Sequence, residues 1–354
     1  MAGVAGIEIR TAVAKANDWG TAVAVGVGDG ILTLPQTIKK DAPVDVDDSL
    51  GNFWIKDGLL GAIKVEGAMP AYLRYDSLDM LIALFMGDSA GSPVQQGGSI
   101  AYAQTFKWAE SLSGLFCTIA RDMKNYILEI PSAKIAGMSI KGEIGKALQI
   151  SFDVIGINKV ADSVINTLTG FNSDVTWPEL MNRVKFSEGV FRINAQSGDA
   201  LDSGDTIYPS SFELTAKRKM SGVYDGQYTF VSGSNIQDLI DEPQNDGLPD
   251  ISLKLTFPRH TSSTYLTILQ GDTRQKMDIT FTGALIVDPY YRQFKLELPH
   301  LQLKNDDPAD AQGRIDEPLE FAVHGASSAP NGMTGITDPF WVSVVNKQKQ
   351  DMLP

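Results

Sequence analysis

The sequence predicts a mainly β protein with an internal repeat, and three observations support this. Short segments rich in Val, Ile, Phe and Thr are separated by Gly, Pro, Asn and Asp, the composition of strands and turns. Several of these segments alternate apolar and polar residues, as expected for a sheet with one buried and one solvated face. Two stretches far apart in the chain also share one residue pattern. The clearest strand segments are 62–66, 126–130, 148–154, 252–257 and 294–298.

The repeat is clearest at two strand segments that end in proline. Tyr126–Pro131 and Phe294–Pro299 both read aromatic, any residue, Leu, Glu, aliphatic, Pro, with an offset of 168 (294 − 126). Each is followed by a second alternating segment that ends in glycine, at Gly156 and Gly325, with an offset of 169 (325 − 156). Such a steady offset indicates a duplicated unit, and the alternative is a pair of similar but unrelated β-hairpins.

Upstream of these strands the correspondence is looser, because the loops differ in length. The matched segments are 63–70 with 253–258, 84–88 with 269–272, and 103–108 with 276–281. We therefore expect two tandem β-sandwich or barrel domains, over residues 1–165 and 166–325, followed by a C-terminal tail or arm over 326–354.

One flanking helix is expected in each domain. Apolar residues at i, i+3, i+4 and i+7 predict a helix over Ser77–Met86, with Asp76 and Ser77 as N-caps and Gly87 as its end. Weaker signals predict single helical turns at 178–181 and 235–240.

Charge and apolar content narrow the classes of function. The 43 acidic and 30 basic residues give a formal charge of −13, which argues against a protein that grips nucleic-acid phosphates and suits a surface that DNA slides past. The chain has no run of ~20 apolar residues, and its start lacks a basic segment followed by an apolar one. We expect no membrane span and no signal peptide. The single cysteine, Cys117, lies in an apolar run and is predicted to be buried.

The sequence contains no chemical motif that predicts catalysis. The histidines His260, His300 and His324 do not have metal-ligand spacing. Gly26–Gly30 is better explained as a turn than as a phosphate-binding loop, and no G-x-S-x-G motif is present. Three charged clusters have two interpretations each: Asp45–Asp48 and Asn305–Asp307 as acidic turns or calcium ligands, and Lys217–Lys219 as a solvated strand end or a contact with an acidic neighbouring subunit. We predict no catalytic, cofactor-binding or metal-binding residue, no cofactor, and no enzyme activity.

Several segments together resemble a known family. They are the turn Asp18–Ala22, Gly67–Pro70 ahead of Leu81–Gly87, and Tyr126–Pro131 leading to Phe152–Gly156. Over residues 11–325, this order resembles the two-domain, duplicated major tail tube proteins of long-tailed, siphovirus-type bacteriophages. The resemblance implies rings in which the inner strands of neighbouring subunits form one shared β-barrel.

The resemblance also implies a function, that of a structural virion protein whose rings stack into the tail tube, the conduit for genome ejection. Its partners would be further copies of itself, three chains forming a pseudo-hexameric ring, together with a tape measure protein and a tail terminator. The channel would be lined by acidic or small polar side chains, and DNA would pass through it without specific binding. The protein, made in the host cytoplasm, would reside in the virion. Long segments that suit stacking arms are 41–52, 87–100, 232–249 and 326–354.

Two alternatives from other classes remain open at this point. One is another ring-forming component of a phage tail or secretion tube, such as a distal tail adaptor. The other is an all-β enzyme or carbohydrate-binding module, which would expose clustered aromatic residues or paired acids in a cleft. Within the C-terminal tail, the apolar segment Asp338–Val345 is either an ordinary last strand or an arm that docks on a neighbour.

Overall fold

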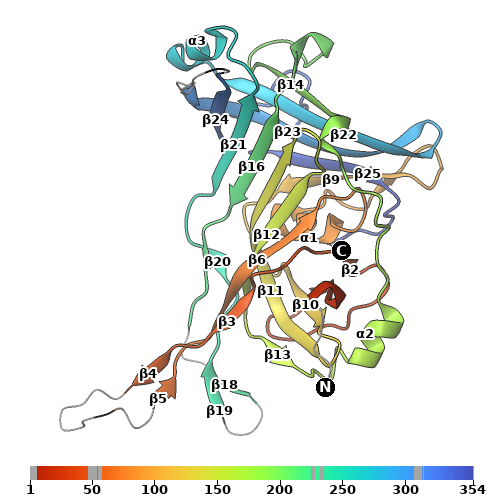
Figure 1. The fold of residues 1–354 in the computed structure, drawn as a ribbon, viewed down its shortest axis with the longest axis vertical. Helices are drawn as coiled ribbons and strands as arrows, with labels where there is room; N and C mark the ends of the chain where they lie inside the picture. The colour runs from red at the N-terminus through yellow and green to blue at the C-terminus, as the bar shows by residue number, and fades with distance from the viewer. Residues whose placement is uncertain are drawn as a thin grey trace.

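The computed structural model describes residues 6–46, 54, 58–224, 228–231, 235–306, 313 and 315–353. It is mainly β, as predicted (Figure 1). Along the first part of the chain the strands are β1 Arg10–Ala16, β2 Gly30–Ile31, β3 Lys39–Asp41, β4 Val44–Val46, β5 Gly58–Leu60, β6 Lys64–Tyr72, β7 Gly87–Asp88, β8 Val94–Gln95, β9 Tyr102–Trp108, β10 Phe116–Asp122, β11 Ile127–Glu143, β12 Gln149–Gly156 and β13 Val160–Ala161.

The remaining strands and the helices complete the fold. The strands are β14 Gly189–Ala195, β15 Thr206–Ile207, β16 Ser211–Lys217, β17 Met220–Ser221, β18 Tyr228–Val231, β19 Asn235–Asp238, β20 Gln244–Asn245, β21 Asp250–Phe257, β22 Gln275–Val287, β23 Tyr290–Asp306, β24 Glu317–Val323 and β25 Trp341–Asn346. The helices are α1 Asp79–Met86, α2 Leu168–Asp174 and α3 Thr264–Gln270, with short 3-10 helices η1 Gly6–Glu8, η2 Phe186–Glu188 and η3 Ser203–Asp205.

Eight strands form one antiparallel sheet that runs along the molecule, in the order β3-β6-β12-β11-β16-β21-β24-β23. We call it the continuous sheet. Buried residues alternate with partly exposed ones along its strands, as at Ile150, Phe152 and Val154 of β12. Because successive side chains of a strand point to opposite faces, one face of this sheet is apolar and the other polar.

The apolar face is covered by a second layer of strands and by α1. The first halves of β11 and β23 leave the continuous sheet to pair with β10, and with β22 and β25, respectively. One core cluster joins apolar side chains of the continuous sheet, such as Ile140 and Leu214, with Phe85 of α1 and Val342 of β25. The second layer and the continuous sheet therefore share one core.

Two sets of elements have the same order and the same pairing. The first set is β6, α1, β10, β11 and β12, and the second is β21, α3, β22, β23 and β24. Partners on β11 and β23 are offset by 168 (301 − 133) throughout. Each residue pair of the first set has an equivalent in the second set, given after it here: Cys117–Ala133 and Gln275–Leu301; Ile119–Ile130 and Met277–Leu298; Ile135–Val154 and Leu303–Phe321; Gly137–Asp153 and Asn305–Glu320; Gly67–Val154 and Leu253–Phe321.

Both long strands also bulge at equivalent places. One residue of β10 lies opposite two of β11, Pro131 and Ser132, and one residue of β22 lies opposite two of β23, Pro299 and His300. Next to the bulges, the N–H of Ile157 donates to the carbonyl of Ser132 and the N–H of His324 donates to that of His300, each at 3.0 Å. Proline has no N–H for the ladder, so each one is accommodated by the same local distortion.

One match made from the sequence is wrong. Residues 103–108 were matched with 276–281, but β9, which contains them, pairs with β25. It is β10 that pairs with β11 as β22 pairs with β23. Both β9 and β10 precede β11 and both mix aromatic or aliphatic residues with polar ones, so residue patterns alone did not separate them.

Two strands connect the sets. β16 pairs with β11 of the first set along one edge and with β21 of the second set along the other. β25 pairs with β23 of the second set and with β9, which packs beside α1 of the first. The apolar C-terminal segment thus forms a strand within its own chain.

The helix predictions were partly correct. The helix predicted at Ser77–Met86 exists as α1, which ends as predicted at Gly87, with a positive φ of 90°. Its N-cap is Leu78, whose side chain makes no capping hydrogen bond, so Asp76 and Ser77 were the wrong caps. The turn expected at 235–240 is wrong because residues 235–238 form β19, and 178–181 is not helical.

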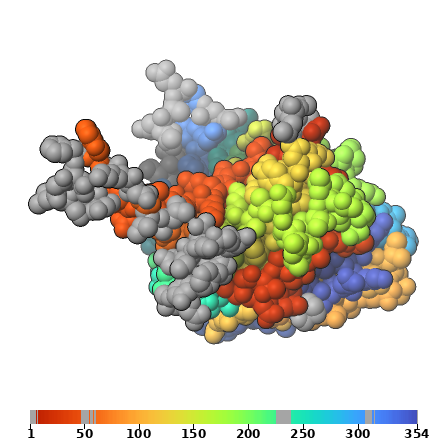
Figure 2. Space-filling view, turned by 90° about the horizontal axis from the view of Figure 1, so that it is seen from below, coloured from red at the N-terminus to blue at the C-terminus, as the bar shows by residue number. Residues whose placement is uncertain are grey.

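Two β-hairpins lie at one end of the continuous sheet. β4 pairs with β5 on the connection between β3 and β6, and β18 pairs with β19 on the connection between β16 and β21. In Figure 1 both lie at the lower end, and in Figure 2 the orange segment of β4 and β5 stands away from the body. Of the segments expected to be arms, 87–100 contains β7 and β8, which pair with β9.

Candidate functional site: the polar face of the continuous sheet

The polar face carries rows of side chains that cross the strands in register. One row alternates in charge over four neighbouring strands: Lys141, Glu213, Lys254 and Glu320. Opposite charges directly across a strand pair attract each other. Lys254 Nζ lies 3.7 Å from Glu320, with the two side chains 56% and 39% exposed, so this pair adds little to stability. The row therefore shapes the chemistry of the face more than it stabilises the fold.

The next row consists of hydroxyl groups. Ser151, Ser139, Thr215 and Ser252 lie opposite one another on β12, β11, β16 and β21. These small side chains leave the backbone close to solvent and carry no charge. The middle of the face is therefore smooth, polar and neutral.

A third row returns to charged residues around a glycine. Asp153, Gly137, Lys217 and Asp250 lie opposite one another on the same four strands. A Cβ at Gly137 would come within 2.5 Å of Asp153 Oδ2, so glycine at this position makes room for the carboxylate. The three rows together make a face on which acids, lysines and hydroxyl groups are mixed.

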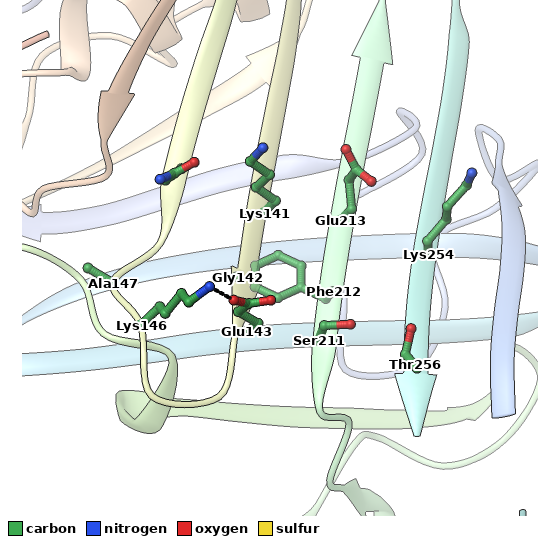
Figure 3. Close-up of a pocket in the computed structure, with 11 residues that line it drawn as sticks. Lys141, Gly142, Glu143, Lys146, Ala147, Ser211, Phe212, Glu213, Lys254 and Thr256 are labelled. Atoms are coloured by element: carbon green, nitrogen blue, oxygen red, sulfur yellow. Dashed lines mark ion pairs between the residues drawn. The ribbon is translucent and has the colours of Figure 1, made fainter. Parts of the chain in front are cut away.

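A shallow hollow of about 450 Å³ lies on this face where β11, β16 and β21 meet (Figure 3). Figure 3 shows Lys141, Glu213 and Lys254 aligned across the three strands above Glu143, Ser211 and Thr256. Small-molecule sites are usually enclosed and mostly apolar. This hollow is shallow, and most of its lining residues are charged or carry a hydroxyl or amide group, which suits a surface that is not meant to hold a ligand.

Phe212 shows how the strand separates the two faces. It lies between Ser211 and Glu213 on β16 and is buried on the opposite side. Its ring lies 5.5 Å from that of Phe191 and 5.9 Å from that of Phe281, in an aromatic cluster of the core. The polar face is thus supported from behind by rigid packing.

The histidines were predicted to have no metal-binding role, and the structure brings two of them together. The rings of His300 and His324 meet edge to face with centroids 5.7 Å apart, and burial lowers the pKa of His300. His260 Nδ1 lies 3.3 Å from Glu317 Oε1. Within the described residues, no group of three or more His, Cys, Asp or Glu side chains has the arrangement of a metal site.

Two predictions from the sequence, on Cys117 and on Gly26–Gly30, are confirmed. Cys117 is fully buried, its thiol donates to the carbonyl of Ala133 at 3.5 Å, and burial raises its pKa to about 12. Gly26–Gly30 is a turn, in which the N–H of Gly26 donates to Asp29 Oδ2 at 2.8 Å. It leads into β2 and not into a helix, so it lacks the geometry of a phosphate-binding loop.

The residues of the basic cluster Lys217–Lys219 differ in their exposure to solvent. Lys217 is exposed at the end of β16, whereas Arg218 is buried and donates to the carbonyls of Phe85, Met86 and Ala109 at 2.8–3.0 Å. A contact of Arg218 with an acidic neighbouring subunit is therefore wrong, because its guanidinium caps α1 and lies 3.8 Å from the ring of Trp108. The sequence did not predict this role, since α1 and Trp108 are more than a hundred residues from Arg218 in the chain.

The acidic clusters lie only partly within the described residues. Asp45 belongs to β4, and Asn305 and Asp306 belong to β23. Asp47, Asp48 and Asp307 lie outside the described residues. The described members are therefore parts of strands and not of a calcium-binding loop.

Comparison with known proteins identifies the family. A family model described as phage tail tube protein matches residues 6–323. The chain belongs to this family. A search of curated proteins gave no match. The family confirms the resemblance predicted over 11–325, and it describes a structural component of the phage tail. Among the described helices of this tail tube protein, none has the length and apolar character needed to cross a bilayer.

Proposed function

We propose that this tail tube protein assembles into rings that stack into a hollow tube, the conduit through which the phage genome is ejected. The observation that carries the proposal is the continuous sheet. Its apolar face is covered within the chain, its polar face is not, and its two edge strands, β3 and the end of β23, pair with no further strand among the described residues. Edge strands of this kind invite pairing with another chain.

The repeated elements support a pseudo-sixfold ring of three chains. Each chain supplies two equivalent sets, so that three chains supply six. With eight strands per chain, three chains would close a barrel of 24 strands, wider than the 16 to 18-stranded barrels that already leave a water-filled channel. The proposed domains are those of the sequence, 1–165 and 166–325 with a C-terminal segment 326–354. Phe171 packs with Ala12 and Ile127, which favours counting α2 with the first domain.

The polar face is the proposed wall of the channel. Acidic and small polar residues were expected there, and Glu213, Asp153 and the hydroxyl row fit this expectation. Lysines at 141, 217 and 254 do not fit it. They lie among acids, so local charge is balanced and no continuous basic stripe is offered to DNA phosphates. Such a wall would let DNA slide without specific binding.

The β4–β5 and β18–β19 hairpins are the proposed stacking arms. They occupy equivalent places in the two sets, and both lie at one end of the sheet. Val44 and Val46 of the first hairpin are 57% and 40% exposed, which is apolar surface suited to contact with a neighbouring ring.

The remaining partners follow from the proposed role. A tape measure protein would occupy the channel before ejection and a terminator would close the tube. The protein would be made in the host cytoplasm and would function in the virion without enzyme activity. A distal tail adaptor would share the ring but would be present in few copies.

Negative-stain electron microscopy at rising protein concentration tests the proposal. Rings and stacked hollow tubes are the expected result, with threefold symmetry and a pseudo-sixfold outline in end views. Rings that never stack would favour the adaptor. A chain that stays monomeric or forms a small closed oligomer without a central channel at the highest concentration reached would contradict the proposal and leave the enzyme or carbohydrate-binding alternative.

A further inference from the structure

The junction between the two sets inside one chain offers a template for the junction between chains. β16 pairs with the second half of β11 through seven residue pairs, from Gly137–Lys217 to Glu143–Ser211. Just beyond the strand ends, the N–H of Arg218 donates to the carbonyl of Ala136 at 2.8 Å. The second set has the same strands, but the matching edge of β23 pairs with no described strand beyond Leu301.

The counterpart of β16 in the first set is β3. In the pairing of β16 and β21, Thr215 lies opposite Ser252 and Lys217 lies opposite Asp250. In the pairing of β3 and β6, Lys39 lies opposite Glu66 and Asp41 lies opposite Lys64. β6 and β21 are equivalent with an offset of 186 (253 − 67). Lys39 and Asp41 therefore correspond to Thr215 and Lys217, with an offset of 176 (217 − 41).

We infer that β3 of one chain pairs with the end of β23 of a second copy, in the register that β16 has with β11. Adding 168 to a residue of β11 gives its equivalent on β23, and subtracting 176 from a residue of β16 gives its equivalent on β3. The pair Gly137–Lys217 then corresponds to Asn305–Asp41, and the pair Met138–Ala216 corresponds to Asp306–Lys40. The hydrogen bond between Ala136 and Arg218 becomes one between Lys304 and Ala42. This inference rests on the proposed ring, and it specifies which edges meet and in what register.

The register brings two polar residues together at the junction. It places Asn305 of β23 opposite Asp41 of β3. On the polar face, Asn305 would donate to the carboxylate of Asp41 and continue the row that contains Lys254 and Glu320.

The two edges of one chain cannot meet each other. They are the first and last of eight strands, and seven spacings of ~4.8 Å place them roughly 34 Å apart along a flat sheet. In Figure 1, β3 and β24, the neighbour of the β23 edge, lie far apart on the molecule. Any covalent link between the edges must therefore join two chains.

A cysteine pair tests the register directly. In the template, Gly137–Lys217 is a non-hydrogen-bonded pair, whose Cα atoms are about 4.5 Å apart, within the range of a disulfide. Asp41→Cys with Asn305→Cys should, on mild oxidation of assembled protein, convert monomers into covalent dimers and closed rings on a non-reducing gel. The native Cys117 is fully buried and should not interfere.

Two matched variants control this experiment. Lys40→Cys with Asn305→Cys shifts the register by one residue, which places the cysteines on opposite faces, and should give no cross-linked chains. Ser139→Cys with Thr215→Cys lies at the internal junction and should form a disulfide within one chain, without a change in mass.

The outcomes separate this inference from the proposed function. Cross-links by the in-register pair and none by the shifted pair support the inference. Rings in the microscope without in-register cross-links overturn the register and leave the tube proposal intact. A wild-type chain that forms no rings, together with no cross-linking, overturns both.

Discussion

The two sets share their strand registers but differ in how their helices are packed. Seven residues of α1 are buried, whereas none of α3 is. α1 packs against β11 and β9, its last carbonyls are capped by Arg218, and its first turn is bonded by Asn346 of β25. α3 packs mainly against β23. The first set is therefore completed by strands and side chains from the rest of the chain, and the second set is left more open.

This difference shows that the same local pattern can end in different environments. β16 and β25 each cross from one set to the other, and both bring residues to the first set. In a closed ring the second set would receive its missing strand from the next chain. The comparison suggests four experiments, given from the largest expected effect to the smallest.

The largest effect is expected from emptying the core beneath α1. Phe85 is fully buried, and Phe85→Ala should lower the free energy of unfolding by about 4 kcal/mol, because it leaves a cavity. Leu266 of α3 is 41% exposed, and Leu266→Ala should cost less than about 1 kcal/mol. Urea unfolding of both variants measures the difference. Equal losses would show that the two helices are packed alike.

Arg218 should be the next most important residue for α1. Arg218→Met keeps the apolar stem and removes the donors to the carbonyls of Phe85, Met86 and Ala109, which should cost about 3 kcal/mol. Lys217→Met, at the exposed neighbour, should change stability by less than about 0.5 kcal/mol. The same unfolding assay applies. If both variants are equally stable, Arg218 does not hold the end of the helix.

Asp79 should make the stability of the first set depend on pH. Burial, and then the charge of Asp76, raise its pKa from 3.8 to about 7, against the hydrogen bond from Asn346. The folded protein then holds a proton that the unfolded chain releases, so this contribution is complete below about pH 4 and is lost as the pH rises towards 7. Asp79→Asn should flatten that part of a melting-temperature profile. An unchanged slope between pH 4 and 7 would exclude Asp79 as its source.

The smallest effect is expected on the polar face. The side chains of Lys254 and Glu320 are 56% and 39% exposed, so Glu320→Gln should change the free energy of unfolding by less than about 0.5 kcal/mol. A loss of more than 1 kcal/mol would mean that the charge row is structural. Stability measured at low and high salt provides the check, since screening acts on such a pair.

Much of the fold was predictable because it is encoded locally. Alternation of apolar and polar residues identified the strands around Ile130, Phe152 and Leu255, and Gly87 marked the end of α1. The prolines at 131 and 299 revealed the offset of 168, and the structure has a bulge at each. Each of these signals depends on residues that are neighbours in the chain.

The candidate surface was less predictable. The sequence suggested acidic or small polar residues without saying which positions shared a face. Lys141, Glu213, Lys254 and Glu320 are far apart in the chain and form a row only because four strands pair in register. A shift of one residue in any pair would have turned one of them into the core.

The sequence by itself determined the fold class, the family and the repeat, because periodicity and residue order are local properties of the chain. The tertiary structure alone decided that β10 and not β9 follows the repeat, that β16 and β25 join the two sets, and that Arg218 is buried. These features depend on which distant segments meet. That choice is made by the free energy of packing and strand pairing over the whole chain, and no short stretch of sequence contains it.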